Sequence, residues 1–399
     1  MKQANYFSVL ADEATDCSNT EQMSIVIRFV DKDNEIREEF IRFVECKKGT
    51  TGLELAKNIL NTLPDFELNI EKCRGQGYDG AASMSGKTKG VSSRIKEINP
   101  KAHFFHCDNH NLSLVVGKSC KIQQVRNVLE QLQEVTFFFE NSPKRELCLS
   151  KHLGKGHNKL ESPCQTRWVL RLKGLDTFFF EFAGILSTFE EMAINENKVF
   201  NVKTSSEASS YVRLLTSFQF IVVFVLTKQL MDYFFPITTI LQAKDFDISK
   251  RCEQIENLKK TLKDIRGRID IVHKMWYNIA LELAKEVNVY EVMPRTCWAQ
   301  FYRDNYPDEE ATNYYRKSIT IPLLDHMITE QDERFDTSNL VVYNGLYAVP
   351  RNMVRNIKSK LPWKKKFLEF LEFYKSDLPH TTSIAAELDL WENISKDKK

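Results

Sequence analysis

The chain has 399 residues, and its 56 lysines and arginines nearly balance its 54 aspartates and glutamates, which leaves a net charge of +2. This balance neither requires nor excludes a nucleic-acid partner, because a locally basic site would not change the total much. The longest apolar run, Phe218 to Leu226, is too short to cross a bilayer, and the 9 cysteines are scattered rather than paired. We therefore expect a soluble, membrane-free chain of two or three domains in the nucleus or cytoplasm.

Three strands are predicted in quick succession in the N-terminal region, over residues 6–11, 22–31 and 35–46. Connections this short join antiparallel neighbours, because a parallel crossover needs a dozen residues or more. A helix should follow. Thr51 can cap it, and apolar residues recur at helical spacing until Pro64 ends it.

The next elements predict a parallel part of the same sheet. A strand should run into Asp79, followed by a short helix over residues 91–98 and a fifth strand over residues 102–107. The order β-β-β-α-β-α-β is that of the ribonuclease-H-like fold, in which the first and fourth strands lie side by side. The predicted fold class is thus α/β plus all-α, with a mixed-sheet core over residues 1–150 and an all-α domain over residues 151–399.

Two acidic residues stand at the ends of the first and fourth strands. Asp12 follows an apolar strand, and Asp79 is surrounded by glycines and small residues. Mg²⁺ and Mn²⁺ prefer oxygen ligands on rigid elements, and glycines let a bulky polyanion approach closely. We predict that Asp12 and Asp79 form a pair of metal ligands; for Asp12, the alternative is an ordinary acidic surface turn.

Residues 106–116 contain Cys107 and His110 in a C-x-x-H spacing at a strand-to-helix junction. A structural zinc site requires a second pair of ligands, and the neighbouring Cys and His residues do not have the spacing of such a pair. We therefore expect no zinc here. We instead expect Cys107 and His110 to share a local hydrogen bond.

Arg167 and Trp168 follow a segment rich in Gly, His and Ser. An indole beside a guanidinium could stack on an extruded base and hold its phosphate, which would make this pair a DNA contact. The alternative is a tryptophan buried at the start of the next helix. The basic run at residues 358–367 could likewise contact phosphates or form a solvated helix face. Elsewhere the second half carries apolar stripes at helical spacing, which predict an all-α core.

Five motifs, in order, resemble the hAT superfamily of DNA transposases and most closely its domesticated vertebrate relatives, such as the zinc finger MYM-type proteins. The motifs are FSVLADEATD, GYDGAASMSG, HCDNHNLSLVV, TRW and YYRKSITIPLLDHMITEQDERF. The resemblance implies a ribonuclease-H-like core interrupted by a large helical insertion domain, and metal-assisted attack of water and then of a 3′-hydroxyl on DNA phosphodiesters.

The resemblance also implies a role for each matched residue. Asp12 and Asp79 would be the first and second metal-binding carboxylates, and Cys107 and His110 would lie near the active site. The Arg167–Trp168 pair would start the insertion domain, where the tryptophan stabilises a flipped base.

The departures from the family pattern concern its third acid, a glutamate on a helix after the insertion domain. Glu387 matches an ELxLW segment that precedes that helix, so the third acid is expected to be missing, as are the upstream zinc finger and the dimerisation segment. We predict a transposase-derived, catalytically incomplete protein with a nucleic-acid or chromatin-binding role, using Mg²⁺ or Mn²⁺ only if activity is retained. Two alternatives remain: an active DNA transposase or nuclease, with Glu13, Glu387 or a partner chain as the missing acid, and a helical scaffold that binds proteins.

Overall fold

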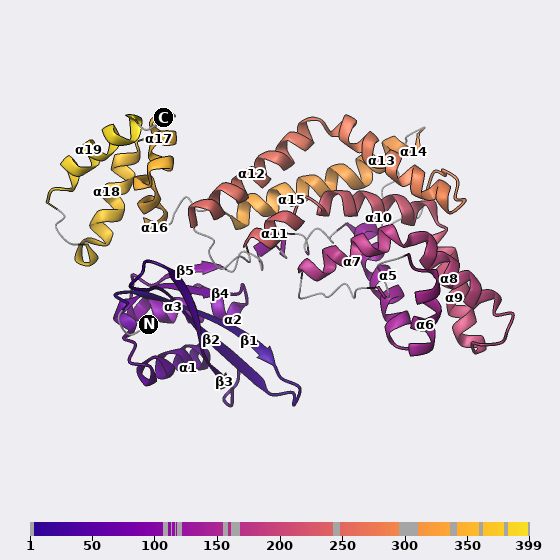
Figure 1. Ribbon diagram of the computed structural model, residues 1–399, viewed down its shortest axis with the longest axis horizontal. Helices are drawn as coiled ribbons and strands as arrows, with labels where there is room; N and C mark the ends of the chain where they lie inside the picture. The colour runs from indigo at the N-terminus through magenta and orange to yellow at the C-terminus, as the bar shows by residue number, and fades with distance from the viewer. Residues whose placement is uncertain are drawn as a thin grey trace. The chain divides into compact units, whose positions relative to one another are not determined.

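The computed structural model describes residues 4–106, 111, 112, 114, 115, 117, 122–154, 159–160, 168–241, 248–294, 310–335, 341–358, 362–378 and 382–397 (Figure 1). The chain divides into two compact units. The sheet unit comprises Met1–His110 and Phe335–Lys399, and the helical unit comprises Asn111–Arg334. These two units differ from the predicted ranges, 1–150 for the mixed-sheet core and 151–399 for the all-α domain.

The sheet unit contains a five-stranded sheet in the order β3-β2-β1-β4-β5. Its strands are β1 (Phe7–Thr15), β2 (Glu21–Val30), β3 (Ile36–Glu45), β4 (Cys73–Tyr78) and β5 (His103–His106). Strand β1 is antiparallel to β2 and β2 to β3, whereas β4 is parallel to both β1 and β5. The predicted mixed sheet, with its first and fourth strands adjacent, is confirmed.

One face of the sheet forms the core of this unit. Alternate residues of β1 and β2, such as Val9 and Ile27, are buried against the helices α1 (Gly52–Asp65) and α3 (Val91–Ile98). Thr51 caps α1 as predicted, because its side chain accepts a hydrogen bond from the Glu54 amide. The two shorter helices of this region are η1 (Ile70–Lys72) and α2 (Ala82–Ser85).

The C-terminal helices of the sheet unit have a small core of their own, formed by Met353, Trp363 and Leu388. They are α16 (Val341–Asn344), η3 (Gly345–Ala348), α17 (Pro350–Lys358), α18 (Trp363–Phe373), η4 (Lys375–Asp377) and α19 (Ile384–Asp397).

Asp377 connects these helices to the sheet, which explains why residues after 334 belong to this unit. Its carboxylate accepts two hydrogen bonds from the guanidinium of Arg74, at 2.6 and 2.9 Å, and one from Lys101 Nζ at 2.8 Å. Burial alone would raise the pKa of Asp377, but the hydrogen bonds and charges of Arg74 and Lys101 outweigh it and lower the pKa to about 2.

Acid should therefore weaken the sheet unit through Asp377. Because its pKa is lower in the folded chain, the ionised group stabilises the fold above about pH 4, and that contribution is lost as the pH falls towards about 2. We expect Asp377→Asn to lower the free energy of unfolding at pH 7 by about 2 kcal/mol and to flatten its dependence on pH in this window. Urea unfolding at a series of pH values measures both effects.

The matched control is Asp389→Asn, because Asp389 pairs with Lys364 at 2.5 Å while its own side chain is 67% exposed. An exposed pair contributes roughly 0–1 kcal/mol, so this variant should unfold almost like the parent chain. Equal effects of the two substitutions would contradict the role assigned to Asp377.

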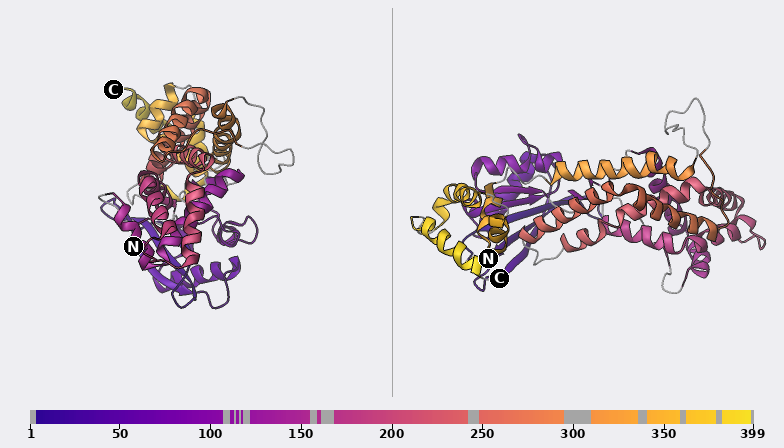
Figure 2. Two further views of the ribbon diagram at one scale, coloured as in Figure 1. Left: turned by 90° about the vertical axis from the view of Figure 1, so that its right-hand side faces the viewer. Right: turned by 90° about the horizontal axis from the view of Figure 1, so that it is seen from above.

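The helical unit packs around α10 (Phe218–Met231), whose apolar run is buried on nearly all sides. Helices α5 (Gln123–Glu140) and α6 (Pro143–His152) pack against α10 and α8, so residues 111–150 belong here. The other helices are α7 (Trp168–Phe180), α8 (Phe182–Ile194), α9 (Val202–Leu215), α11 (Phe235–Leu241), α12 (Ile248–Gly267), α13 (Ile269–Glu286), α14 (Ala311–Tyr315), the π-helical turn η2 (Arg316–Thr320) and α15 (Ile321–Arg334). The long helices α12 and α15 run side by side (Figures 1 and 2).

No single helix in the described ranges is long and apolar enough to cross a membrane. Helices α9 and α10 reach the required length and composition only together, as a pair bent by 69°.

Candidate functional site

Asp12 lies within β1, and Asp79 directly follows Tyr78, the last residue of the neighbouring strand β4. In the parallel pair of β1 and β4, Leu10 lies opposite Gly77, and each acid follows two residues later in its own chain segment. Pairing between these strands ends at this point, so both acids emerge at the same end of the sheet. The predicted adjacency of the first and fourth strands is therefore confirmed, whereas the role of Asp12 and Asp79 as a pair of metal ligands stays a prediction.

Gly75 and Gly77 make the close pairing of β1 with β4 possible. A Cβ atom at Gly77 would lie 2.5 Å from Leu10 Cδ2, and one at Gly75 would lie 2.5 Å from Ser8 Oγ. These two glycines thus leave room for side chains of β1, a role that the sequence analysis did not foresee when it assigned them to the approach of a polyanion.

The segment after Asp79 is held by backbone contacts. Asp79 Oδ1 accepts a hydrogen bond from the Ala81 amide at 3.1 Å, which closes a tight turn into α2. At the start of α1, a Cβ on Gly52 would lie 2.3 Å from the Lys89 carbonyl oxygen and 2.7 Å from that of Ser83. The first turn of α1 therefore packs directly on the backbone of the segment that carries Asp79.

Glu13 is a third acid in the neighbourhood of this pair. Burial raises its pKa first, and the negative charge of Asp79 raises it further, with a smaller effect from Asp12. Ser83 donates a hydrogen bond of 3.4 Å to the Glu13 carboxylate, which acts in the opposite direction. Glu13 thus lies within electrostatic range of both Asp79 and Asp12.

A two-metal centre would need further ligands close to Asp12 and Asp79. In the part of the chain that the structure describes, only Cys148, His152 and Glu191 form a group of three metal-ligand side chains whose ligand atoms all lie within 4.8 Å of one another. Among the described residues, no third acid therefore forms a group of this kind with Asp12 and Asp79. Glu387 instead accepts a hydrogen bond from Ser383 at the start of α19.

Several predicted site residues fall outside the described ranges. Cys107, His110 and Arg167 are among them, so their roles stay predictions. Trp168 is the first residue of α7, but its side chain is not described.

Part of the predicted basic run is occupied by ion pairs within the sheet unit. Lys364 Nζ lies 2.5 Å from carboxylate oxygens of both Asp389 and Glu392, and Lys366 pairs with Glu369 at 3.5 Å. These contacts favour the interpretation of the run as a helix face rather than a phosphate-binding patch.

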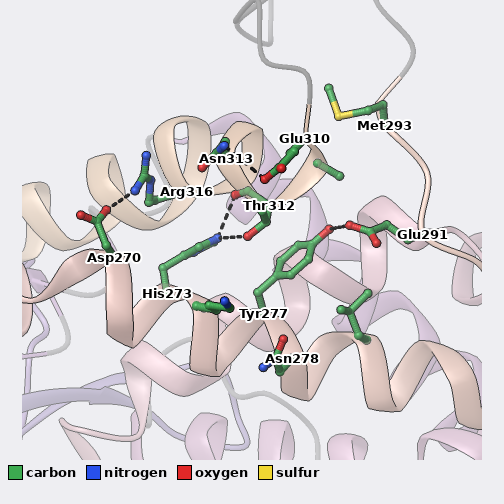
Figure 3. A pocket seen from close by; sticks show the side chains of 13 residues that line it. Asp270, His273, Tyr277, Asn278, Glu291, Met293, Glu310, Thr312, Asn313 and Arg316 are labelled. Atoms are coloured by element: carbon green, nitrogen blue, oxygen red, sulfur yellow. Dashed lines mark hydrogen bonds and ion pairs between the residues drawn. The ribbon is translucent and has the colours of Figure 1, made fainter.

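A cavity of about 720 Å³ in the helical unit was not predicted from the sequence. In it, Tyr277 donates a hydrogen bond of 2.6 Å to Glu291 (Figure 3). His273 is buried, and this lowers its pKa to about 4. The neutral ring donates from Nε2 to the Thr312 carbonyl and accepts at Nδ1 from the Thr320 hydroxyl, both at 2.9 Å. Both ring nitrogens of His273 thus have structural partners.

A family comparison matches the N-terminal part of the chain. Residues 2–90 match the DUF4371 family model, described as the RNase-like domain of ZMYM1/FAM200. This range includes β1, β4 and both Asp12 and Asp79. Residues 2–90 are therefore similar to a ribonuclease-like domain, in agreement with the mixed sheet of this unit.

The chain is also similar to individual proteins over longer stretches. Over 405 residues the chain is 25% identical to the "52 kDa repressor of the inhibitor of the protein kinase" of Homo sapiens, covering 98% of this chain and 52% of the relative. The Mus musculus protein of the same name is 24% identical over 403 residues, with the same coverage. A stretch of 90 residues is 28% identical to the "General transcription factor II-I repeat domain-containing protein 2" of Bos taurus, covering 23% of this chain and 10% of that protein.

The chain spans about half the length of the human and mouse relatives it matches. These matches confirm the resemblance to domesticated hAT transposases.

Proposed function

We propose that this chain is a hAT-transposase-derived, catalytically incomplete protein that binds nucleic acid or chromatin. The observation that carries the proposal is that Asp12 lies in β1 and Asp79 directly follows the adjacent strand β4, while no third acid forms a metal-ligand group with both of them among the described residues. Two-metal phosphoryl transfer needs more oxygen ligands than two carboxylates provide. The fold of the transposase core is then retained as a surface for DNA.

The contact to DNA in this proposal is the Arg167–Trp168 pair. A tryptophan that stacks on an unpaired base contributes about 1–3 kcal/mol, and an adjacent arginine adds a phosphate contact. A nuclear location agrees with the names of the relatives, which describe a repressor and a general transcription factor repeat protein.

A second function, metal-dependent DNA cleavage with Mg²⁺ or Mn²⁺, is favoured by one observation. Glu13 is close enough to Asp79 and Asp12 for their charges to raise its pKa. A divalent cation would relieve this repulsion, and Glu13 would then supply the missing carboxylate.

The experiment compares DNA binding and nicking by the purified chain and its variants. We expect no nicking of hairpin or duplex DNA with either metal, and salt-sensitive binding that persists in Asp12→Ala and Asp79→Ala. Arg167→Ala and Trp168→Ala should each weaken binding about tenfold, in line with one stacking or phosphate contact. Lys203→Ala serves as the charge control, because that side chain is 84% exposed on α9.

Nicking that disappears in Asp12→Ala, Asp79→Ala and Glu13→Gln would instead establish the enzyme and identify its third acid. Absence of both nicking and binding would leave the protein-binding scaffold as the remaining function.

A further inference from the structure

Helix α6 carries a cysteine and a histidine on one face of the helical unit. Cys148 and His152 are four positions apart, so their side chains lie one above the other along the helix. Glu191 of the neighbouring helix α8 faces both. His152 Nε2 and Glu191 Oε2 are 2.6 Å apart, and the ligand atoms of all three side chains lie within 4.8 Å of one another.

The two helices that carry this trio are fixed against each other. A Cβ atom on Gly184 of α8 would lie 2.5 Å from the His152 carbonyl oxygen, so the backbones are in direct contact. Just past α6, the Gly154 amide donates a hydrogen bond of 2.7 Å to the buried carboxylate of Glu181. The three side chains therefore project from rigid, pre-positioned elements, as metal ligands require.

The donor atoms define which metal would fit. A thiolate, an imidazole and a carboxylate together are a ligand set that suits zinc. Mg²⁺ and Ca²⁺ prefer oxygen ligands only, so they do not fit this set. Cys148 is 4% exposed, whereas the His152 side chain is 28% and the Glu191 side chain 49% exposed. The buried sulfur would thus bind the metal from the protein interior. The fourth coordination position of the metal would face solvent and be filled by water.

We propose that Cys148, His152 and Glu191 form a zinc site with three protein ligands and one exchangeable water. Its three ligands are different residues from the predicted metal ligands Asp12 and Asp79 and from the C-x-x-H pair of Cys107 and His110. It does not depend on whether the protein binds DNA.

Metal titration of the chelator-treated full chain tests the proposal. We expect one equivalent of Zn²⁺ to bind, and Co²⁺ in its place to give the charge-transfer absorption of a cobalt–thiolate bond. Cys148→Ser should abolish that absorption, and His152→Gln and Glu191→Gln should each weaken Zn²⁺ binding at least tenfold. Zn²⁺ should also raise the thermal unfolding temperature of the parent chain more than that of Glu191→Gln.

Two controls decide whether the metal is at this site. Cys17→Ser removes an exposed free cysteine and should change nothing. The double variant Cys107→Ser, His110→Asn should also retain the cobalt–thiolate absorption. Lack of that absorption in the parent chain, its persistence in a folded Cys148→Ser variant, or its loss in the double variant would each overturn the proposal. Circular dichroism of each variant verifies that it is folded.

Discussion

Replacing Gly52 by alanine is expected to lower the free energy of unfolding of the sheet unit by about 3 kcal/mol. The added methyl group would lie 2.3 Å from the Lys89 carbonyl oxygen and 2.7 Å from that of Ser83. Both neighbours are backbone atoms, so neither can turn aside as the end of a side chain would. The clash must therefore move α1 or the segment that follows Asp79.

Urea unfolding of Gly52→Ala measures this loss, and Gly267→Ala provides the control. Gly267 ends α12 and has nothing within 4 Å of an added Cβ, so alanine should be neutral or stabilising there by up to about 1 kcal/mol. If Gly52→Ala were as stable as its control, the close packing of α1 on the segment after Asp79 would be refuted.

Phe224→Ala should have the largest effect in the helical unit, a loss of about 3–5 kcal/mol. Phe224 is fully buried in α10, and its ring lies 5.6 Å from that of Phe178 and 6.2 Å from those of Phe182 and Phe220. Removing it leaves a cavity at the centre of this aromatic cluster, and rigid rings on several sides cannot collapse into the space.

Thermal and urea unfolding of Phe224→Ala should show this loss, whereas Phe180→Ala should not. Phe180 is 71% exposed on α7, so its truncation is expected to change stability by no more than about 0.5 kcal/mol. Similar destabilisation by both variants would mean that α10 is not the centre of the helical core.

The sheet was predictable because the sequence features that specify it lie within single strands and the short connections between them. Alternating apolar residues mark β1 and β2, short connections make the first three strands antiparallel, and Thr51 starts α1. Once the strand order was known, it followed from topology alone that the strand containing Asp12 is adjacent to the strand that ends just before Asp79.

The features that were missed depend on contacts between distant parts of the chain. Arg74 and Asp377 are separated by 303 positions, so nothing near either residue indicates their ion pair or the return of the C-terminal helices to the sheet. Cys148 and His152 have a visible spacing on α6, but Glu191 lies 39 positions after His152 and joins them only through helix packing. A helical pattern identifies an apolar face without specifying which helix will cover it.

The ion pair at Asp377 also has a consequence for how the protein is made. Lys101 precedes Asp377 by 276 positions, and a ribosome adds about 5–20 residues per second. Asp377 is therefore synthesised tens of seconds after the strands of the sheet. During that interval the whole helical unit emerges and can fold while Arg74 and Lys101 still lack their carboxylate. The sheet unit is thus completed only after Asp377 has been synthesised, and a chain truncated before residue 377 would contain the whole helical unit but a sheet that lacks this ion pair.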